Sequence, residues 1–167
     1  MGKDRVEMIA TTYEGAIKAT LDAAKALAPE RRTRQVQDGK AHQLWLMGHL
    51  GFAWDTIVNV MALGGTPQLP QTYFKKFAPG QAGGDPVSSK AADYPSWDEV
   101  VSMYEKAGNA AVAKVRSLDD GDLPGGPKGT PPDAFKDFFK VLGTTLGAMG
   151  QHDAYHRGQM GMIGGLK

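Results

Sequence analysis

Hydrophobic residues recur every three or four positions in four long stretches of the chain, which is the spacing of helices that bury one face. Proline borders these stretches, because it breaks the interior of a helix. Of the ten prolines, one is Pro29 and the others fall between residues 67 and 95 or between 124 and 132. The pattern therefore predicts four helices, which cover residues 4–28, 41–63, 97–117 and 131–165.

Two of these stretches also carry helix-start signals. Ser96 and Glu99 have the spacing of a capping box, in which each side chain accepts a hydrogen bond from the other residue's backbone. Pro131, Pro132 and Asp133 place proline in a first helical turn and an acid at the positive end of the helix dipole. The first stretch has a regular apolar stripe, formed by Val6, Ile9, Tyr13, Ile17, Leu21, Ala24 and Ala28.

Four long helices and no alternating strand pattern predict an all-α fold, a four-helix bundle that forms a single domain over residues 1–167. The connection over residues 64–95 is much longer than neighbouring antiparallel helices need. It contains Tyr73, Phe74 and Phe77. A disordered linker would leave these aromatic side chains without packing, so we expect a loop folded over one end of the bundle.

Composition excludes several classes of function. The 167 residues carry a net charge of +1, which argues against nucleic acid as a partner. Without cysteine the chain has no disulfide, no thiolate ligand and no cysteine nucleophile. We find no signal-peptide pattern and no apolar stretch of bilayer length, so we expect no membrane association and a cytoplasmic location.

Two histidines interrupt the apolar face of the last predicted helix. This face is a heptad-like series of residues that includes His152, His156 and Gln159. The two histidines are four positions apart, or about 6 Å along the axis, so both imidazoles can reach one metal ion. A pair of structural histidines is the alternative. However, two adjacent buried imidazoles need partners when neutral and repel each other when charged, and a divalent cation removes both problems.

The second predicted helix supplies a third ligand. His42 and His49 lie about 10 Å apart along its axis, too far for one ion to bind both. If the second and fourth helices are antiparallel, His49 is level with the His152 and His156 pair and His42 is not. That arrangement requires an up-down-down-up bundle with a long crossover between the second and third helices, and residues 64–95 provide its length.

Short motifs in three of the predicted helices resemble the DinB/YfiT-like family. They are Gly48-His49-Leu50, the Pro95–Glu99 helix start, and the run from His152 to Gln159 with its His-Arg-Gly-Gln sequence. The resemblance implies a bundle that holds one divalent metal ion through His49, His152 and His156. It also implies metal-dependent enzymes, some of which are transferases that use low-molecular-weight thiols such as bacillithiol or mycothiol.

Three neutral imidazoles leave coordination positions open, as in catalytic metal sites. Zn²⁺ or Ni²⁺ is the expected ion, with Fe²⁺, Co²⁺ and Mn²⁺ as alternatives. We expect a small-molecule substrate and a thiol transferase; a hydrolase, and a non-enzymatic bundle with a structural metal, remain open. The sequence identifies no general base: Asp55 and Tyr155 are near the ligands in sequence, and Asp153 is expected to be solvated or to support the site from outside.

The last predicted helix has a second face made of small residues. Each glycine inside a helix costs about 1 kcal/mol relative to alanine. Close approach of another helix offsets such a cost, either within the bundle or in a second subunit. We expect a homodimer that uses this face, which consists of Gly143, Gly147, Gly150, Ala154, Gly158, Gly161 and Gly165.

Overall fold

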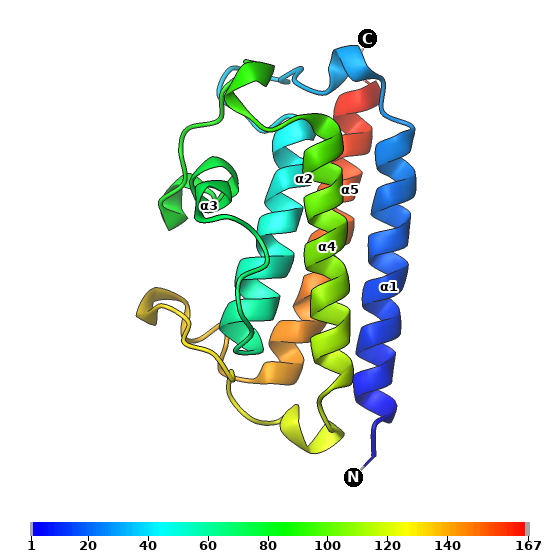
Figure 1. The fold of residues 1–167 in the computed structure, drawn as a ribbon, viewed down its shortest axis with the longest axis vertical. Helices are drawn as coiled ribbons and strands as arrows, with labels where there is room; N and C mark the ends of the chain where they lie inside the picture. The colour runs from blue at the N-terminus through cyan, green and yellow to red at the C-terminus, as the bar shows by residue number, and fades with distance from the viewer. Residues whose placement is uncertain (1, 166–167) are drawn as a thin grey trace.

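A computed structural model describes residues 2–165, which form an all-α structure with no β-strand. The α-helices are α1 (Asp4–Lys25), α2 (Gln43–Phe52), α3 (Gln71–Phe77), α4 (Trp97–Arg116) and α5 (Leu142–Gly165). The four long rods are α1, α2 with its continuation, α4 and α5; Figure 1 shows them side by side, with the smaller helix α3 on one flank. A segment of π-helix, η2 (Ala53–Ala62), continues α2 directly and completes the second rod.

Hydrogen bonds between the rods show their relative directions. Near one end of the bundle, the Gln43 side chain of α2 donates to the carbonyl of Met160 in α5. Farther along, Trp54 of η2 donates to Asp153, so the second rod and α5 are antiparallel. In Figure 1, α1 and α5 run up the view while α2 and α4 run down it. This direction places the middle of α2 beside the middle of α5.

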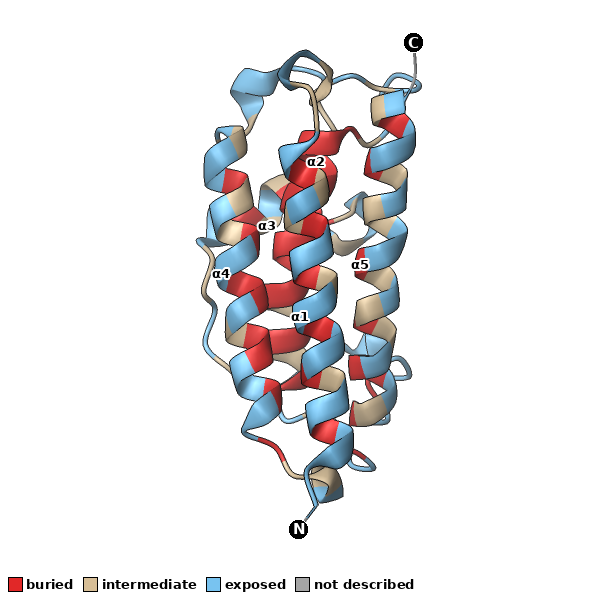
Figure 2. Ribbon diagram, turned by 90° about the vertical axis from the view of Figure 1, so that its right-hand side faces the viewer, coloured by how far each residue is buried: buried red, intermediate tan, exposed pale blue. Residues whose placement is uncertain are grey.

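The core lies between the four rods, as the inward-facing buried residues in Figure 2 show. On α1 the predicted apolar stripe is buried at Val6, Tyr13 and Ile17. All ten residues of α2 are buried, and α3, α4 and α5 pack against this helix. Helix α4 starts as predicted, and the Ser96 hydroxyl accepts a hydrogen bond from the Glu99 backbone N–H.

The last helix begins at Leu142, and the predicted start at residue 131 is wrong. The two prolines there precede a short 3-10 turn, Asp133–Phe135, and not the long helix. The loop after α4 explains the later start. Its carbonyls accept hydrogen bonds from the first N–H groups of α5, with Gly125 bonded to Leu142 and Leu123 to Gly143.

The long crossover is ordered, but it does not fold over one end of the bundle as predicted. It contains α3, which packs against the side of α2. Gly48 makes this contact possible, since a Cβ atom there would lie only 2.1 Å from the Phe77 ring. The aromatic residues of the crossover are therefore used for packing, with Tyr73 and Phe77 buried.

Leu123 and Thr12 cover the small-residue face of α5 at Gly143 and Gly150, but most of the face is exposed. Among the described residues, no neighbouring atom lies within 4 Å of a Cβ atom built at Gly147, Gly158, Gly161 or Gly165. Close helix packing inside the bundle therefore does not account for these glycines. In addition, none of the helices in residues 2–165 is long and apolar enough to cross a membrane. The cytoplasmic location stays a prediction.

Candidate metal centre

The structure brings together the three histidines that the sequence singled out. His49 comes from α2, and His152 and His156 come from α5, where one helical turn separates them. One ring nitrogen from each residue can be chosen so that all three atoms lie within 4.8 Å of one another. The His49 ring centroid is 5.3 Å from that of His152 and 4.8 Å from that of His156. Antiparallel packing of α2 and α5 thus places the imidazoles at one depth in the bundle.

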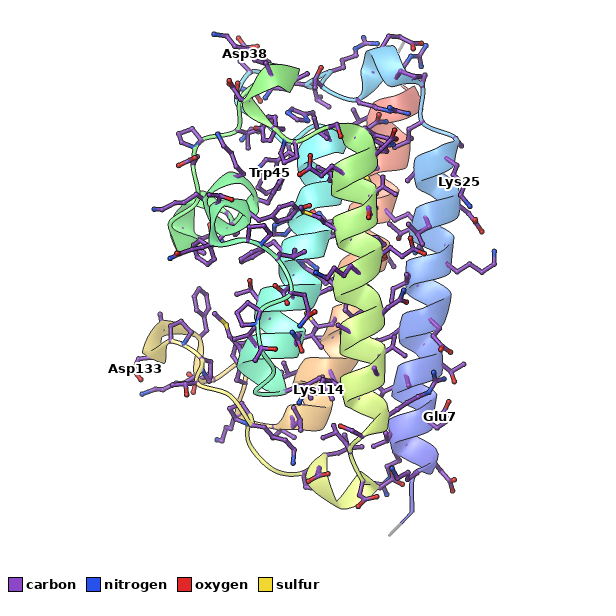
Figure 3. The ribbon with its side chains drawn as sticks, in the orientation of Figure 1. Glu7, Lys25, Asp38, Trp45, Lys114 and Asp133 are labelled. Carbon is purple, nitrogen blue, oxygen red and sulfur yellow. The ribbon has the colours of Figure 1, made fainter. Side chains whose placement is uncertain are left out.

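His49 is fixed in both orientation and tautomer by the crossover. Its Nδ1 lies 2.9 Å from the carbonyl oxygen of Phe77, which can only accept, so Nδ1 carries the proton. The lone pair of Nε2 is then free for another partner. Trp45 stacks on the imidazole with ring centroids 4.8 Å apart and planes 7° apart. Figure 3 labels Trp45 on the crossover side of α2.

His156 is oriented in the same manner by Gln159, which lies one turn further along the ligand face. The Nδ1–H of His156 donates to Gln159 Oε1 at 2.7 Å. The Gln159 amide in turn donates to the Tyr155 hydroxyl at 3.0 Å, which fixes the orientation of the amide. This leaves His156 Nε2 with its lone pair directed at His152. Hydrogen-bonded outer partners of this type usually support metal-binding histidines.

The spacing of two of the ring nitrogens, Nε2 of His152 and Nε2 of His156, fits a shared cation. These two atoms are 3.2 Å apart, and two nitrogens bound to a tetrahedral Zn²⁺ at about 2.05 Å lie about 3.3 Å apart. Without a cation, His152 must donate its Nε2 proton to His156. Its Nδ1 atom is buried and has no hydrogen-bond partner among the described residues. His152 is thus the one member of the cluster that its surroundings do not hold in place.

Burial keeps all three imidazoles neutral near pH 7, which is the form that binds metals. Burial lowers the pKa of His49 to about 4 and that of His152 to about 3, with the neighbouring histidines adding to the effect. The pKa of His156 is lowered for the same main reason, while the Gln159 hydrogen bond opposes the shift.

A cavity of about 410 Å³ opens on the cluster and gives a small molecule access to it. This volume is within the usual range for ligand pockets. The second rod and α5 form its inner wall, and the crossover and the segment before α5 form the outer wall. The lining residues are Trp45, His49, Phe52, Ile57, Met61, Phe74, Pro79, Gln81, Ala82, Pro132, Phe135, Phe138, Phe139, His152 and His156.

Asp153 is not solvated as expected; it is 1 % exposed and accepts hydrogen bonds from three other rods. Its donors are Thr20 of α1, Trp54 of η2 and Tyr104 of α4, at 2.5, 3.0 and 2.7 Å. Arg157 adds a charged contact at 3.5 Å. Burial raises the pKa of Asp153, and these donors oppose the shift. The residue ties the four rods together beside the histidines.

Sequence reasoning missed this cluster because Asp153 points away from the two ligands beside it in sequence, and no donor for it was identified. In the bundle, α1 packs beside α5 and brings Thr20 to this carboxylate. A signal was present in the polar donors Thr20, Trp54 and Tyr104, each of which lies on the largely apolar buried face of its helix. Buried donors of this kind require an acceptor.

The remaining candidates lie outside the histidine cluster. His42 caps the start of α2, where its Nδ1 accepts from the Trp45 N–H and its Nε2–H donates to the Ser88 carbonyl. Asp55 accepts from the backbone N–H groups of Gln68 and Leu69, so it anchors the crossover. Both residues therefore have structural partners, and the general base stays unassigned.

Comparison with protein families agrees with this arrangement. A model described as the DinB superfamily matches residues 12–160 of the 167. The chain belongs to the DinB superfamily. The matched region of this DinB superfamily member contains all three histidines and the Asp153 cluster. Curated proteins gave no match to the chain.

Proposed function

We propose that His49, His152 and His156 bind one divalent metal ion, and that this DinB superfamily member is a metal-dependent enzyme acting on a small molecule. The observation that carries the proposal is the meeting of three imidazoles, two of them oriented through their Nδ1 atoms, in the wall of a 410 Å³ cavity. When bound, such an ion would lower the pKa of a coordinated water or thiol and thereby make it a nucleophile at neutral pH.

The protein's own residues would prepare this chemistry. The Phe77 carbonyl and Gln159 keep Nε2 of His49 and His156 unprotonated and aimed inward. The aromatic wall that includes Trp45 and Phe74 limits access of bulk water to the imidazoles. Three protein ligands leave coordination positions free on the cavity side, which favours a catalytic ion over a structural one.

The reaction we propose is transfer of a low-molecular-weight thiol to a small electrophile. The chain has no cysteine, so a sulfur nucleophile would have to come from a cosubstrate. A metal-dependent hydrolase is the alternative, because the same ion would activate water. Zn²⁺ or Ni²⁺ suits three imidazoles best; Fe²⁺, Co²⁺ and Mn²⁺ are the other candidates.

Metal content tests the site directly. Elemental analysis of purified protein should give one divalent ion per chain, and the double variant His49→Ala, His152→Ala should lose it. Circular dichroism of the variant should still show the helical fold. Stoichiometric metal in the folded double variant would disprove the three-histidine site.

Turnover separates the candidate reactions. Purified protein is incubated with a panel of thiols and simple electrophiles, with and without a chelator. Thiol-dependent conversion that the chelator removes supports the transferase. Hydrolysis of activated esters or amides without a thiol supports the hydrolase, and absence of both reactions favours a bundle that only binds a ligand.

We also propose that the open face of α5 packs against a second copy of the chain. The exposed residues along this face are small and uncharged. Thr12 of α1 borders the face, since it lies 3.3 Å from a Cβ built at Gly150. An uncharged face is complementary to a copy of itself, which suits a symmetric dimer.

A further inference from the structure

The residues that line the cavity beside the histidines indicate which molecules it accepts. Apart from the three histidines, the polar groups of the described lining residues are the Gln81 amide and the Trp45 indole N–H, and none of these residues is Lys, Arg, Asp or Glu. The other residues are aromatic rings, aliphatic side chains, Met61 and two prolines. A charged group placed against these walls would lose its hydration without gaining a partner, at a cost of several kcal/mol.

Aromatic rings that pack against one another form much of the cavity walls, so the packing of the fold itself makes these walls apolar. Phe52 of α2 and Phe74 of α3 pack edge to face, with ring centroids 5.3 Å apart. On the opposite side, Phe138 and Phe139 pack in the same manner at 5.1 Å. Aromatic surfaces of this type favour flat or aliphatic ligands that bury apolar area.

The outer wall leaves apolar surface open to solvent. Phe135 and Phe138 are 41 % and 44 % exposed, although both line the cavity. They belong to the segment between residues 131 and 141, which leaves the bundle on the same side as the crossover; Figure 3 labels Asp133 in this segment. A ligand that enters here would cover exposed ring surface. Apolar ligands therefore gain binding free energy at the mouth of the cavity as well as inside it.

We infer that the cavity binds an uncharged, mostly aromatic or aliphatic molecule whose single polar group faces the three imidazoles. The inference deepens the proposed function, on which it rests, because it names the substrate class of the same site. In the transferase reading this molecule is the electrophile. A thiol cosubstrate that carries carboxylates would have to keep them outside the cavity, where water can solvate them.

Two fluorescent probes of nearly the same shape test the inference on metal-free protein. N-phenyl-1-naphthylamine is neutral, and 8-anilino-1-naphthalenesulfonate is the same ring system with one negative charge. Fluorescence titration should show saturable binding of the neutral probe at one site per chain. Its affinity should exceed that of the sulfonate at least tenfold. Equal or tighter binding of the sulfonate would overturn the inference.

Lysine substitutions in the cavity wall test whether the probes bind in this cavity. Phe138→Lys should weaken the neutral probe at least fivefold and strengthen the sulfonate, because the new ammonium group pairs with it. Val141→Lys is the matched control, since Val141 is similarly exposed in the same segment but does not line the cavity. Phe135→Lys is a second test of the wall. If neither wall variant changes either affinity, the probes bind elsewhere and the inference fails.

A parallel measurement of metal content distinguishes failure of this inference from failure of the proposed function. Metal content and probe affinity are measured on the same preparations. Probe binding without metal binding supports the ligand class and contradicts the metal enzyme. Metal binding without selective probe binding supports the metal site and overturns the ligand class.

Discussion

At the scale of single residues, the site depends on side chains that do not themselves face the metal position. His49 and His156 are oriented through their Nδ1 atoms, by a backbone carbonyl and by Gln159. Asp153, beside His152, collects donors from three other rods. Gln159 and Asp153 can each be substituted without removing any of the three imidazoles. The effects of ligand orientation and of fold stability can therefore be measured apart from loss of a ligand.

Removing the Asp153 carboxylate should destabilise the fold severely. Asp153→Ala leaves the Trp54 N–H and the Thr20 and Tyr104 hydroxyls without their acceptor, and loss of one partner of a buried charged cluster costs about 3–5 kcal/mol. Asp153→Asn keeps one acceptor oxygen and should cost about 1–3 kcal/mol. Urea denaturation followed by circular dichroism measures both. If the two variants unfold like the wild type, the carboxylate does not hold the rods together.

Gln159 should act on metal affinity without acting on the fold. Gln159→Leu removes the acceptor for His156 Nδ1–H, and loss of such an outer partner lowers metal affinity about 10–100-fold. Competition with a chelating dye gives the dissociation constants. Gln151→Leu is the matched control, because Gln151 is an exposed glutamine on the same helix and makes no such contact. Equal affinities for the two variants would show that Gln159 does not orient the ligand.

At the scale of elements, periodicity predicted the long helices well because each buries a regular stripe against its neighbours. It also predicted that His49 lies level with His152 and His156, since the axial rise of a helix is fixed. Local signals failed where tertiary contacts decide the structure. The prolines at 131 and 132 precede a short 3-10 turn and not the long helix. Helix α5 starts later, where the N–H groups of Leu142 and Gly143 donate to carbonyls of the loop after α4. Helix α3 forms where the crossover packs on α2.

The loop before α5 should tolerate change at one glycine and not at another. A Cβ atom at Gly129 would lie 2.1 Å from the Val60 carbonyl oxygen, whereas one at Gly126 meets nothing within 4 Å. Gly129→Ala should therefore destabilise the protein by about 1–3 kcal/mol, as overpacking does. Gly126→Ala should leave the urea midpoint near that of the wild type. The same destabilisation in both variants would mean that the close approach to η2 is not the cause.

At the scale of the whole molecule, the proposed metal would join two rods that are far apart in sequence. His49 and His152 are separated by 102 intervening residues, and the ion would bind the folded state but not the unfolded chain. Binding of this kind stabilises by mass action, about 2.7 kcal/mol when the free ion is at 100 times its dissociation constant. Metal binding should therefore be measurable as an increase in the free energy of unfolding.

Thermal unfolding should accordingly respond to the ion. Added Zn²⁺ or Ni²⁺ should raise the melting temperature of the chelator-treated wild type in a concentration-dependent manner. The variant His49→Ala, His152→Ala should show no such rise, because it retains one ligand of the three. A similar rise in the double variant would show that the ion acts at another place on the protein.

The open face of α5 gives a prediction about assembly. Glycines at 147, 158, 161 and 165 weaken the helix by about 1 kcal/mol each relative to alanine, and within residues 2–165 no atom packs against a Cβ built at any of them. If a second copy offsets this cost, light scattering should give the mass of a dimer at micromolar concentration. Gly158→Glu should yield a monomer, because it places a charge in the contact. Ala113→Glu, on the exposed surface of α4, is the control and should stay dimeric. A monomeric wild type would leave the glycines of α5 unexplained by assembly.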